Sequence, residues 1–171
     1  NLGFLDDVGI AVNPTAEPDK VDLVFDITEG KPGMLTAGAG ISSRDGLVGT
    51  VSLQHLNFLG RAYRTSLSWN FGKRVQDYSL SWTTPWLGGR PTSLGFDVYN
   101  TRRINPFDTS LSAYVERRTG GTIRLGPRFE EDKYQLNMTY GLARISIANV
   151  QDQFKGTLSE STSIQSSFGA E

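Results

Sequence analysis

Few residues of this chain have the type and spacing that catalysis requires. The only histidine, His55, lies near Ser52 and Gln54 and could be considered as a base for a membrane hydrolase. Nucleophilic catalysis needs a nucleophile, a base and an orienting group held together. Neither a nucleophile elbow nor a pair of carboxylates accompanies His55 in the sequence. We therefore expect His55 to occupy a half-polar structural position, and the chain not to be an enzyme.

Metal and nucleotide sites are not expected either. With one histidine and no cysteine, the chain lacks the ligand spacing of a zinc site. The stretch Gly38-Ala39-Gly40 lacks the third glycine and the following helix of a dinucleotide-binding loop. The sequence therefore predicts no cofactor and no metal. Two interpretations of these glycines remain open: they let neighbouring backbone approach the strand, or they weaken the pairing of the strand, as a gate requires.

The clearest pattern lies between residues 61 and 86, where side chains alternate in type. One parity carries Tyr63, Thr65, Leu67, Trp69 and Phe71, then Tyr78, Leu80, Trp82 and Thr84, whereas the other carries mainly Ser, Thr and Asn. A period of two indicates strands with one apolar and one polar face. The polar face of a soluble sandwich usually carries Lys and Glu. A polar face of small hydroxyl residues, combined with an apolar face rich in Trp and Tyr, is typical of lipid outside and a hydrated lumen inside.

The alternation continues from residue 34 onward and predicts an all-β fold, an antiparallel transmembrane β-barrel of which about seven or eight strands are present. The strands are expected at 34–44, 47–57, 61–71, 75–86, 92–103, 118–129, 133–147 and from 162. The residues expected to face lipid are Tyr63, Leu67, Trp69, Phe71, Tyr78, Leu80, Trp82, Trp86, Leu94, Phe96, Leu136, Met138 and Tyr140. On the lumen parity, Arg64, Arg124 and Arg128 either line a conduit or pair with Asp77 or Asp97.

The first 32 residues have a different organisation. Residues 2–8 read as the end of a helix closed by Gly3, followed by a strand at 8–12 and a second at 21–29. The segment 29–33 is a plausible boundary, so residues 1–32 and 33–171 are expected to form two units. Asp45-Gly46 predicts a two-residue hairpin turn. Both ends of the chain read as cut, since it begins without a signal peptide and stops within an expected strand.

Loop lengths give an orientation, because transmembrane barrels keep short turns in the periplasm and longer loops outside. The connections at 57–61, 86–91 and 129–133 are short, and they alternate with longer ones at 104–117 and 150–161. The short set, including the turn next to Trp86, is therefore expected in the periplasm.

Charge and hydropathy exclude other classes. Seventeen basic and eighteen acidic residues give a net charge of −1, which argues against binding nucleic acid or an anionic membrane surface through bulk charge. No apolar run approaches the roughly 18 residues of a membrane helix. The mean hydropathy of −0.31 still allows a membrane location, because a barrel strand needs only about 9 to 11 residues with every second one apolar. The absence of cysteine fits an oxidising compartment.

Several motifs in order resemble a known family. Leu2-Gly3-Phe4-Leu5-Asp6-Asp7-Val8, Asn13-Pro14 and the segment 19–29 are similar to the end of the last POTRA domain of the BamA family of outer-membrane barrel assembly factors. Asn57-Phe58-Leu59-Gly60-Arg61, the segment 85–91 and the segment 117–121 resemble the first barrel strands and periplasmic turns of that family. The resemblance covers essentially the whole chain, and its specificity lies in the order of the motifs.

The resemblance implies a function. Members of this family have a sixteen-stranded barrel with a weak seam between first and last strands, periplasmic POTRA domains and accessory lipoproteins of an assembly complex. This chain would supply the end of the POTRA region and the N-terminal half of the barrel; the earlier POTRA domains, the later strands and the arginine-bearing loop that folds into the lumen are absent from it. The implied location is the bacterial outer membrane with the N-terminal segment in the periplasm. The implied partners are nascent outer-membrane β-barrel proteins and outer-membrane lipids, with no nucleic acid.

The implied gate is the first barrel strand. The residues expected to receive a substrate strand there are Leu35, Thr36, Ala37, Gly38, Ala39, Gly40 and Ile41. Two alternatives remain beside this assembly function. One is an outer-membrane transporter, either a passive pore or a two-partner secretion translocator, which would share the alternating strands. The other is a barrel phospholipase that depends on His55.

Overall fold

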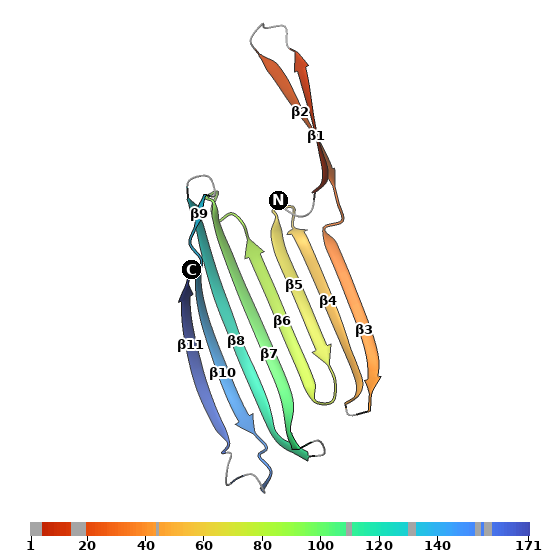
Figure 1. The fold of residues 1–171 in the computed structure, drawn as a ribbon, viewed down its shortest axis with the longest axis vertical. Helices are drawn as coiled ribbons and strands as arrows, with labels where there is room; N and C mark the ends of the chain where they lie inside the picture. The colour runs from red at the N-terminus through yellow and green to blue at the C-terminus, as the bar shows by residue number, and fades with distance from the viewer. Residues whose placement is uncertain are drawn as a thin grey trace.

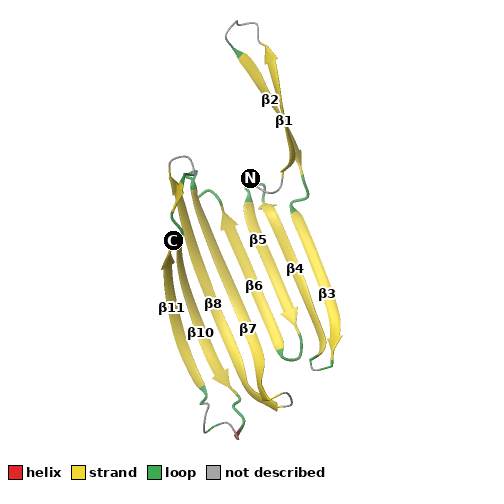
Figure 2. Cartoon of the chain, viewed as in Figure 1, coloured by secondary structure: helices red, strands yellow, loops and turns green. Residues whose placement is uncertain are grey.

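The computed structural model describes residues 5–14, 20–43, 45–108, 111–129, 133–152, 155 and 159–171, and within them it contains only strands and their connections. The described part of the chain holds no helix long and apolar enough to cross a membrane. The strands form two separate antiparallel sheets, which Figures 1 and 2 show end to end.

The smaller sheet is a hairpin of β1 (Leu5–Pro14) and β2 (Val21–Glu29). The predicted strand at 21–29 is confirmed. The predicted helix end was wrong over residues 5–8, which already belong to β1, while residues 1–4 lie outside the described part. The ladder explains this difference, because Leu5 pairs with Glu29 and Val8 with Ile27, so cross-strand pairing extends over these residues.

The larger sheet holds nine strands in an up-and-down order, with β3 at one edge and β11 at the other. Its strands are β3 (Gly33–Ser42), β4 (Gly46–Phe58), β5 (Tyr63–Phe71), β6 (Val75–Thr84), β7 (Thr92–Asp108), β8 (Leu111–Phe129), β9 (Tyr134–Gln135), β10 (Met138–Ala148) and β11 (Ser161–Ala170). Strands β3 to β8, then β10 and β11, pair in this order, and the two-residue β9 pairs with β8. The all-β barrel architecture predicted from the alternation is confirmed, with the sheet open between β3 and β11.

Three expected boundaries need correction. The predicted loop at 104–117 is mostly strand, because β7 and β8 continue as one long hairpin. Proline lacks an amide donor, but Pro106 lies where the register shifts, and a bulge tolerates the missing hydrogen bond. The predicted strand 133–147 is divided into β9 and β10. The β3–β4 turn pairs Ser42 with Gly46, so it spans three residues rather than two, although Gly46 has the positive φ of 68° that was expected.

The turn between β4 and β5 is stabilised by the side chain of Asn57. Leu59, Gly60 and Ala62 all have positive φ between β4 and β5. The Asn57 carboxamide oxygen accepts a hydrogen bond from the Ala62 amide at 2.8 Å, and the Gly60 amide donates to the Asn57 carbonyl at 3.1 Å. These bonds satisfy backbone groups that the tight turn would otherwise leave unpaired.

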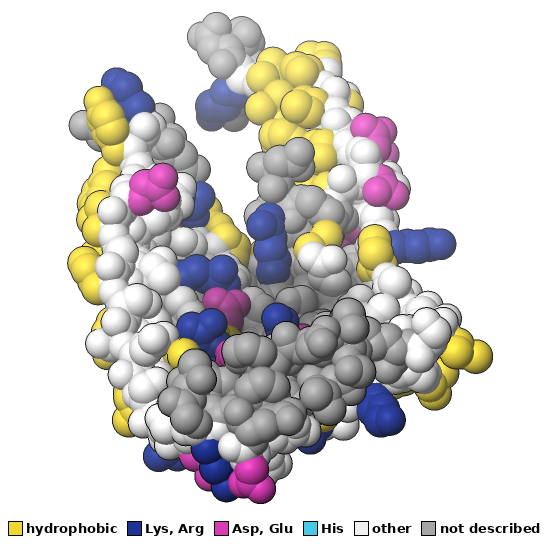
Figure 3. Space-filling view, turned by 60° about the horizontal axis from the view of Figure 1, so that its bottom comes forward, with side chains coloured by type: hydrophobic (Ala, Val, Ile, Leu, Met, Phe, Trp, Pro, Cys, Tyr) yellow, Lys and Arg dark blue, Asp and Glu magenta, His cyan; other side chains and the backbone are white. Residues whose placement is uncertain are grey.

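The larger sheet is curved, and it has almost no core of its own. Among the described residues only Thr84, Gly95, Gly126, Ala143 and Val150 are buried. Figure 3 shows the concave side as a hollow that contains basic and acidic side chains, with hydrophobic side chains along the outer flanks. The β1–β2 hairpin lies beyond the end of this sheet at which β4 connects to β5 and β6 to β7 (Figure 1). The connections expected to be short therefore share one end with the hairpin.

Candidate functional site

The strand register places the predicted apolar residues on one face of the sheet. Residues directly opposite each other in an antiparallel ladder have side chains on the same face. Leu67 is opposite Leu80 and Leu80 is opposite Val98, while Trp82 is opposite Phe96. The same rows continue through β8 and β10, where Phe96, Ile123 and Tyr140 follow one another. We call this side of the sheet the apolar face.

The apolar face is both large and exposed. Leu67 is 50% exposed, Leu80 41%, Leu142 49% and Ile123 56%. A contiguous apolar surface of this size marks contact with a membrane or a partner. The predicted residues Tyr63, Leu67, Trp69, Phe71, Tyr78, Leu80, Trp82, Leu94, Phe96, Met138 and Tyr140 all have the parity of this face.

The set of apolar-face residues is larger than the prediction from the sequence. It also includes Val51, Leu53, Val98, Ile123, Leu125, Leu142, Ile164 and Phe168. The signal that could have identified them is the same alternation, because Leu53 lies between Ser52 and Gln54 and Ile164 between Ser163 and Gln165.

Two predicted lipid-facing residues lie outside the strands. Leu136 lies in the link between β9 and β10, where its amide donates to the Pro127 carbonyl at 3.1 Å. Trp86 lies in the β6–β7 connection, and the Arg128 guanidinium carbon lies 5.2 Å from the centre of its ring. Arg128 also donates to the Pro85 carbonyl at 2.8 Å. The sheet register therefore assigns no face to Trp86, and its contact with lipid stays a prediction.

The opposite, polar face carries hydroxyl and charged side chains that bind one another. Asp97 accepts hydrogen bonds from Ser81 at 2.6 Å and from Arg124 at 2.9 Å. Arg103 lies 3.5 Å from Asp77, and the Ser68 and Ser79 hydroxyls are 2.7 Å apart. Of the two alternatives for Arg124, the geometry therefore shows pairing with Asp97.

His55 has the parity of the apolar face, and both polar and apolar groups lie around it. Its ladder partners are Gly33 and Thr65, so it shares a face with Leu53. Its Nδ1 accepts a hydrogen bond from the Asn57 amide at 3.3 Å, and its ring packs edge-on against Phe58. Ser52, the nearby hydroxyl considered for a hydrolase, pairs with Ser68 on the polar face. The structure therefore does not bring these two side chains together.

The strand predicted as a gate is an edge strand in the described sheet. β3 pairs with β4 through ten consecutive residues from Gly33 to Ser42, without a bulge. Its other edge has no partner strand in the described part of the chain. Leu35, Ala37, Ala39 and Ile41 lie on the apolar face, and Thr36, Gly38 and Gly40 lie on the polar face. Exposed backbone N–H and C=O groups along such an edge can pair with another strand.

Gly38 and Gly40 of β3 differ from Gly120 of β8 in what surrounds them. A Cβ on Gly40 would meet nothing within 4 Å, and one on Gly38 would make only an ordinary contact with Thr50 at 3.7 Å. In contrast, a Cβ on Gly120 would lie 2.6 Å from the Tyr99 hydroxyl and 2.7 Å from the Leu142 carbonyl oxygen. Close approach of neighbouring backbone therefore explains Gly120 but does not explain Gly38 or Gly40.

Chemical sites are sparse on both faces. The described residues include no group of three or more His, Asp or Glu side chains that could hold a metal ion. The apolar face and the backbone of the β3 edge are two surfaces of the larger sheet that are open to another molecule.

Known proteins are similar to this chain in sequence and in fold. The family model of the Omp85 superfamily domain matches residues 57–170. The outer membrane protein assembly factor BamA of Neisseria meningitidis is 33% identical over 141 residues, which are 80% of this chain and 18% of that protein. The chloroplastic outer envelope protein 80 of Oryza sativa is 35% identical over 109 residues, which are 59% of this chain and 16% of that protein.

A solved structure confirms the architecture. The crystal structure of BamA from Haemophilus ducreyi lacking POTRA domains 1–3 matches with a TM-score of 0.65 at 21% identity, covering 98% of this chain and 34% of that one. The chain spans less than a fifth of the length of the two protein relatives above. Because the family match covers most of the chain, and because the fold is that of a BamA-like barrel fragment, the chain belongs to the Omp85 superfamily, as its resemblance to the BamA family predicted.

Proposed function

We propose that this chain is part of an outer-membrane assembly factor that helps nascent β-barrel proteins fold into the membrane. The observation that carries the proposal is the combination of an exposed apolar face with a β3 edge that has no partner strand in the described part of the chain. The relative from Neisseria meningitidis is named an outer membrane protein assembly factor, which agrees with this function.

In this proposal, β3 recognises its substrate through backbone hydrogen bonds. Unpaired N–H and C=O groups cost several kcal/mol each in hydrocarbon, so an incoming strand that pairs with the edge lowers the free energy of both partners. Gly38 and Gly40 themselves present no side chain that would select one substrate sequence. One edge could therefore serve many different barrel proteins, and no catalytic step is involved.

The β1–β2 hairpin is proposed to be the end of a POTRA domain in the periplasm. Its ladder places Val8 opposite Ile27, Ile10 opposite Phe25 and Val12 opposite Leu23, so one side of the hairpin is apolar throughout. All of these residues are more than 40% exposed. An isolated hairpin is at best marginally stable in water, so further elements of such a domain would have to cover it. Accessory lipoproteins, as the family resemblance implies, would act on this side of the membrane.

Trapping with introduced cysteines tests the proposal. Cysteines at Thr36, Gly38 and Gly40 of the full-length protein should form disulfides with the terminal strand of a stalled substrate barrel, in one consistent register. Cysteines at Thr50 and Ser52 of the paired strand β4 serve as matched controls and should not. Normal assembly after β3 has been locked to the last strand of the barrel by a crosslink would contradict the proposal.

The second candidate is a transporter, which the charged lining of the polar face favours. Arg124, Asp97, Arg103 and Asp77 all lie on the polar face. A passive pore would conduct ions in planar bilayers whether or not β3 is locked, whereas an assembly factor would lose its activity on locking. Conductance and barrel assembly measured on the same locked protein therefore separate the two functions.

A further inference from the structure

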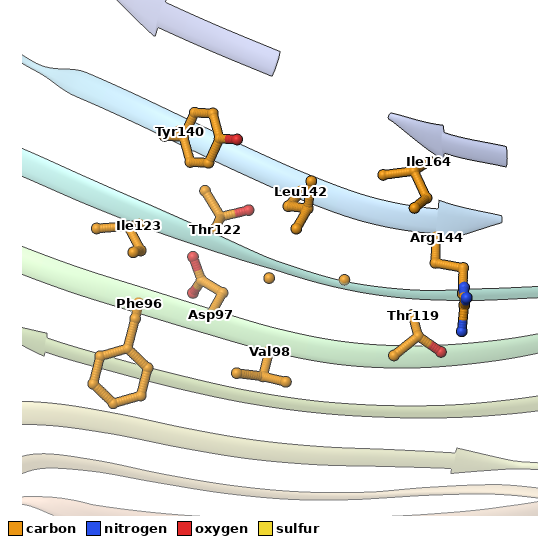
Figure 4. A pocket seen from close by; sticks show the side chains of 12 residues that line it. Phe96, Asp97, Val98, Thr119, Thr122, Ile123, Tyr140, Leu142, Arg144 and Ile164 are labelled. Carbon is orange, nitrogen blue, oxygen red and sulfur yellow. The ribbon is translucent and has the colours of Figure 1, made fainter. Parts of the chain in front are cut away.

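A shallow groove crosses the apolar face over β7, β8 and β10 (Figure 4). It has a volume of about 520 Å³, and its apolar lining includes Phe96, Val98, Ile123, Tyr140 and Leu142. The groove exists because Gly121 lies between Val98 and Leu142 in the cross-strand row and leaves a gap between these two side chains. Its width and lining suit a flexible hydrocarbon chain.

One end of this groove is cationic. Arg144 lies at the end remote from Tyr140, and its side chain extends toward Thr119, the residue directly opposite it in the ladder (Figure 4). One row further along the same face, Arg102 and Arg117 lie directly opposite each other. Because Arg117 and Thr119 are two residues apart on one strand, Arg144 is the diagonal neighbour of Arg117. Arg102, Arg117 and Arg144 therefore occupy neighbouring positions on the apolar face, with Arg144 lining one end of the groove; we call these three residues the arginine cluster.

Nothing within the described part of the chain neutralises the arginine cluster. No hydrogen bond or ion pair links these three guanidinium groups to another described residue. The other described members of their two rows carry no acidic side chain; they include Phe71, Gln76, Ser146 and Thr162 in the row of Arg117, and Val51, Trp69, Tyr78, Asn100 and Ile164 in the row of Arg144. The nearest acid along β8, Glu116, pairs with Arg103 in the ladder and so lies on the polar face. Like charges directly opposite one another destabilise a sheet, so an anion bound here would relieve a repulsion.

The neighbouring residues indicate the depth of the arginine cluster in a membrane. Trp69 and Tyr78 are directly opposite each other with stacked rings 6.0 Å apart, and they occupy the same cross-strand row as Arg144. Trp and Tyr concentrate where hydrocarbon meets headgroups. Long arginine side chains also reach from such a position to the polar interface.

We propose that this groove and the arginine cluster form a binding site for an anionic phospholipid, with an acyl chain along the groove and the phosphate at Arg102, Arg117 and Arg144. Guanidinium groups bind phosphate with two parallel charge-assisted hydrogen bonds. The rows leading away from the cluster toward Tyr140 become apolar. An amphiphile with one anionic end matches this gradient, whereas a free phosphate would leave the groove empty. This inference rests on the proposed membrane placement of the apolar face.

The test uses the full-length protein in detergent, incubated with phosphatidylglycerol or with phosphatidylcholine of the same acyl chains, and counts retained lipids by native mass spectrometry. We expect a preference for phosphatidylglycerol of about tenfold, which corresponds to one charge-assisted hydrogen bond. The double variant R117Q/R144Q should lose the preference. Glycerol phosphate at the same concentration should not displace the lipid, because it lacks the acyl chain.

Arg118→Gln provides the matched control. Arg118 is the neighbour of Arg117 but lies on the polar face, where it donates to Gln165 at 3.4 Å. This variant removes the same charge and should keep the preference. Each single variant, R117Q and R144Q, is measured as well, so that a folding failure of the double variant still leaves a test. Equal retention of both lipids by the unchanged protein, or an equal loss in R118Q, would overturn the inference. If the unchanged protein retains both lipids equally but still assembles substrate barrels, the proposed function stands and only the lipid site fails.

Discussion

The Arg124 guanidinium lies 2.9 Å from a carboxylate oxygen of Asp97, and this ion pair joins β7 to β8 on the polar face of the sheet. Both side chains are partly exposed, at 47% and 28%. Because water and salt screen such a pair, we expect Arg124→Gln to lower the free energy of unfolding by less than about 1 kcal/mol. Asp97→Ala should cost more, since it also removes the acceptor of the hydrogen bond from the Ser81 hydroxyl. Urea unfolding in lipid vesicles measures both variants. A cost above 2 kcal/mol for Arg124→Gln would show that the polar face is drier than proposed.

The apolar face gives a stronger prediction. Leu67→Arg is expected to cost roughly 2–4 kcal/mol if this face lies near the bilayer midplane, because an arginine there has no water around it. Ser68→Arg, one residue along on the polar face, is the matched control and should be mild. Folding titrations in lipid vesicles provide the comparison. Equal costs for the two variants would remove the proposed lipid contact of the apolar face.

The glycines of the sheet are expected to respond differently to alanine. Gly120→Ala would force a Cβ against the Tyr99 hydroxyl and the Leu142 carbonyl oxygen, and overpacking of this kind costs about 1–3 kcal/mol. Gly40→Ala meets nothing within 4 Å, so we expect a change in stability within about 0.5 kcal/mol. Both can be measured as shifts of the unfolding midpoint. A large stability loss in Gly40→Ala would mean that another element packs against β3 in the full-length protein.

The orientation of the sheet can be tested at the two ends of β5. A cysteine at Arg61, in the β4–β5 turn, should resist a membrane-impermeant reagent added to intact cells, since this turn is proposed to be periplasmic. A cysteine at Lys73, in the β5–β6 turn at the opposite end, is the control and should react. The reverse labelling pattern would invert the proposed topology and would place the arginine cluster on the periplasmic side.

The sequence alone determined the strands and their two faces. Alternation at Leu67, Trp69, Leu80 and Trp82 requires no neighbour to be recognised, because side-chain direction in a strand depends only on parity. Positive φ at Gly46 could likewise be predicted, since Asp-Gly favours it locally. Elements that depend on local chemistry, such as β2 and the tight turns, were therefore predicted close to their observed positions.

The tertiary structure decided what depends on pairing. β7 and β8 extend through an expected loop because each supplies hydrogen bonds to the other and a bulge accommodates Pro106. The pairing of His55 with Gly33 and Thr65 depends on the register of β3, β4 and β5, whereas its shared parity with Leu53 is already present in the sequence. The arginine cluster combines residues from β7, β8 and β10, and a net charge of −1 gives no sign of it. The register that aligns these strands arises from cross-strand contacts over the whole sheet, so only the folded chain brings the three arginine residues to neighbouring positions.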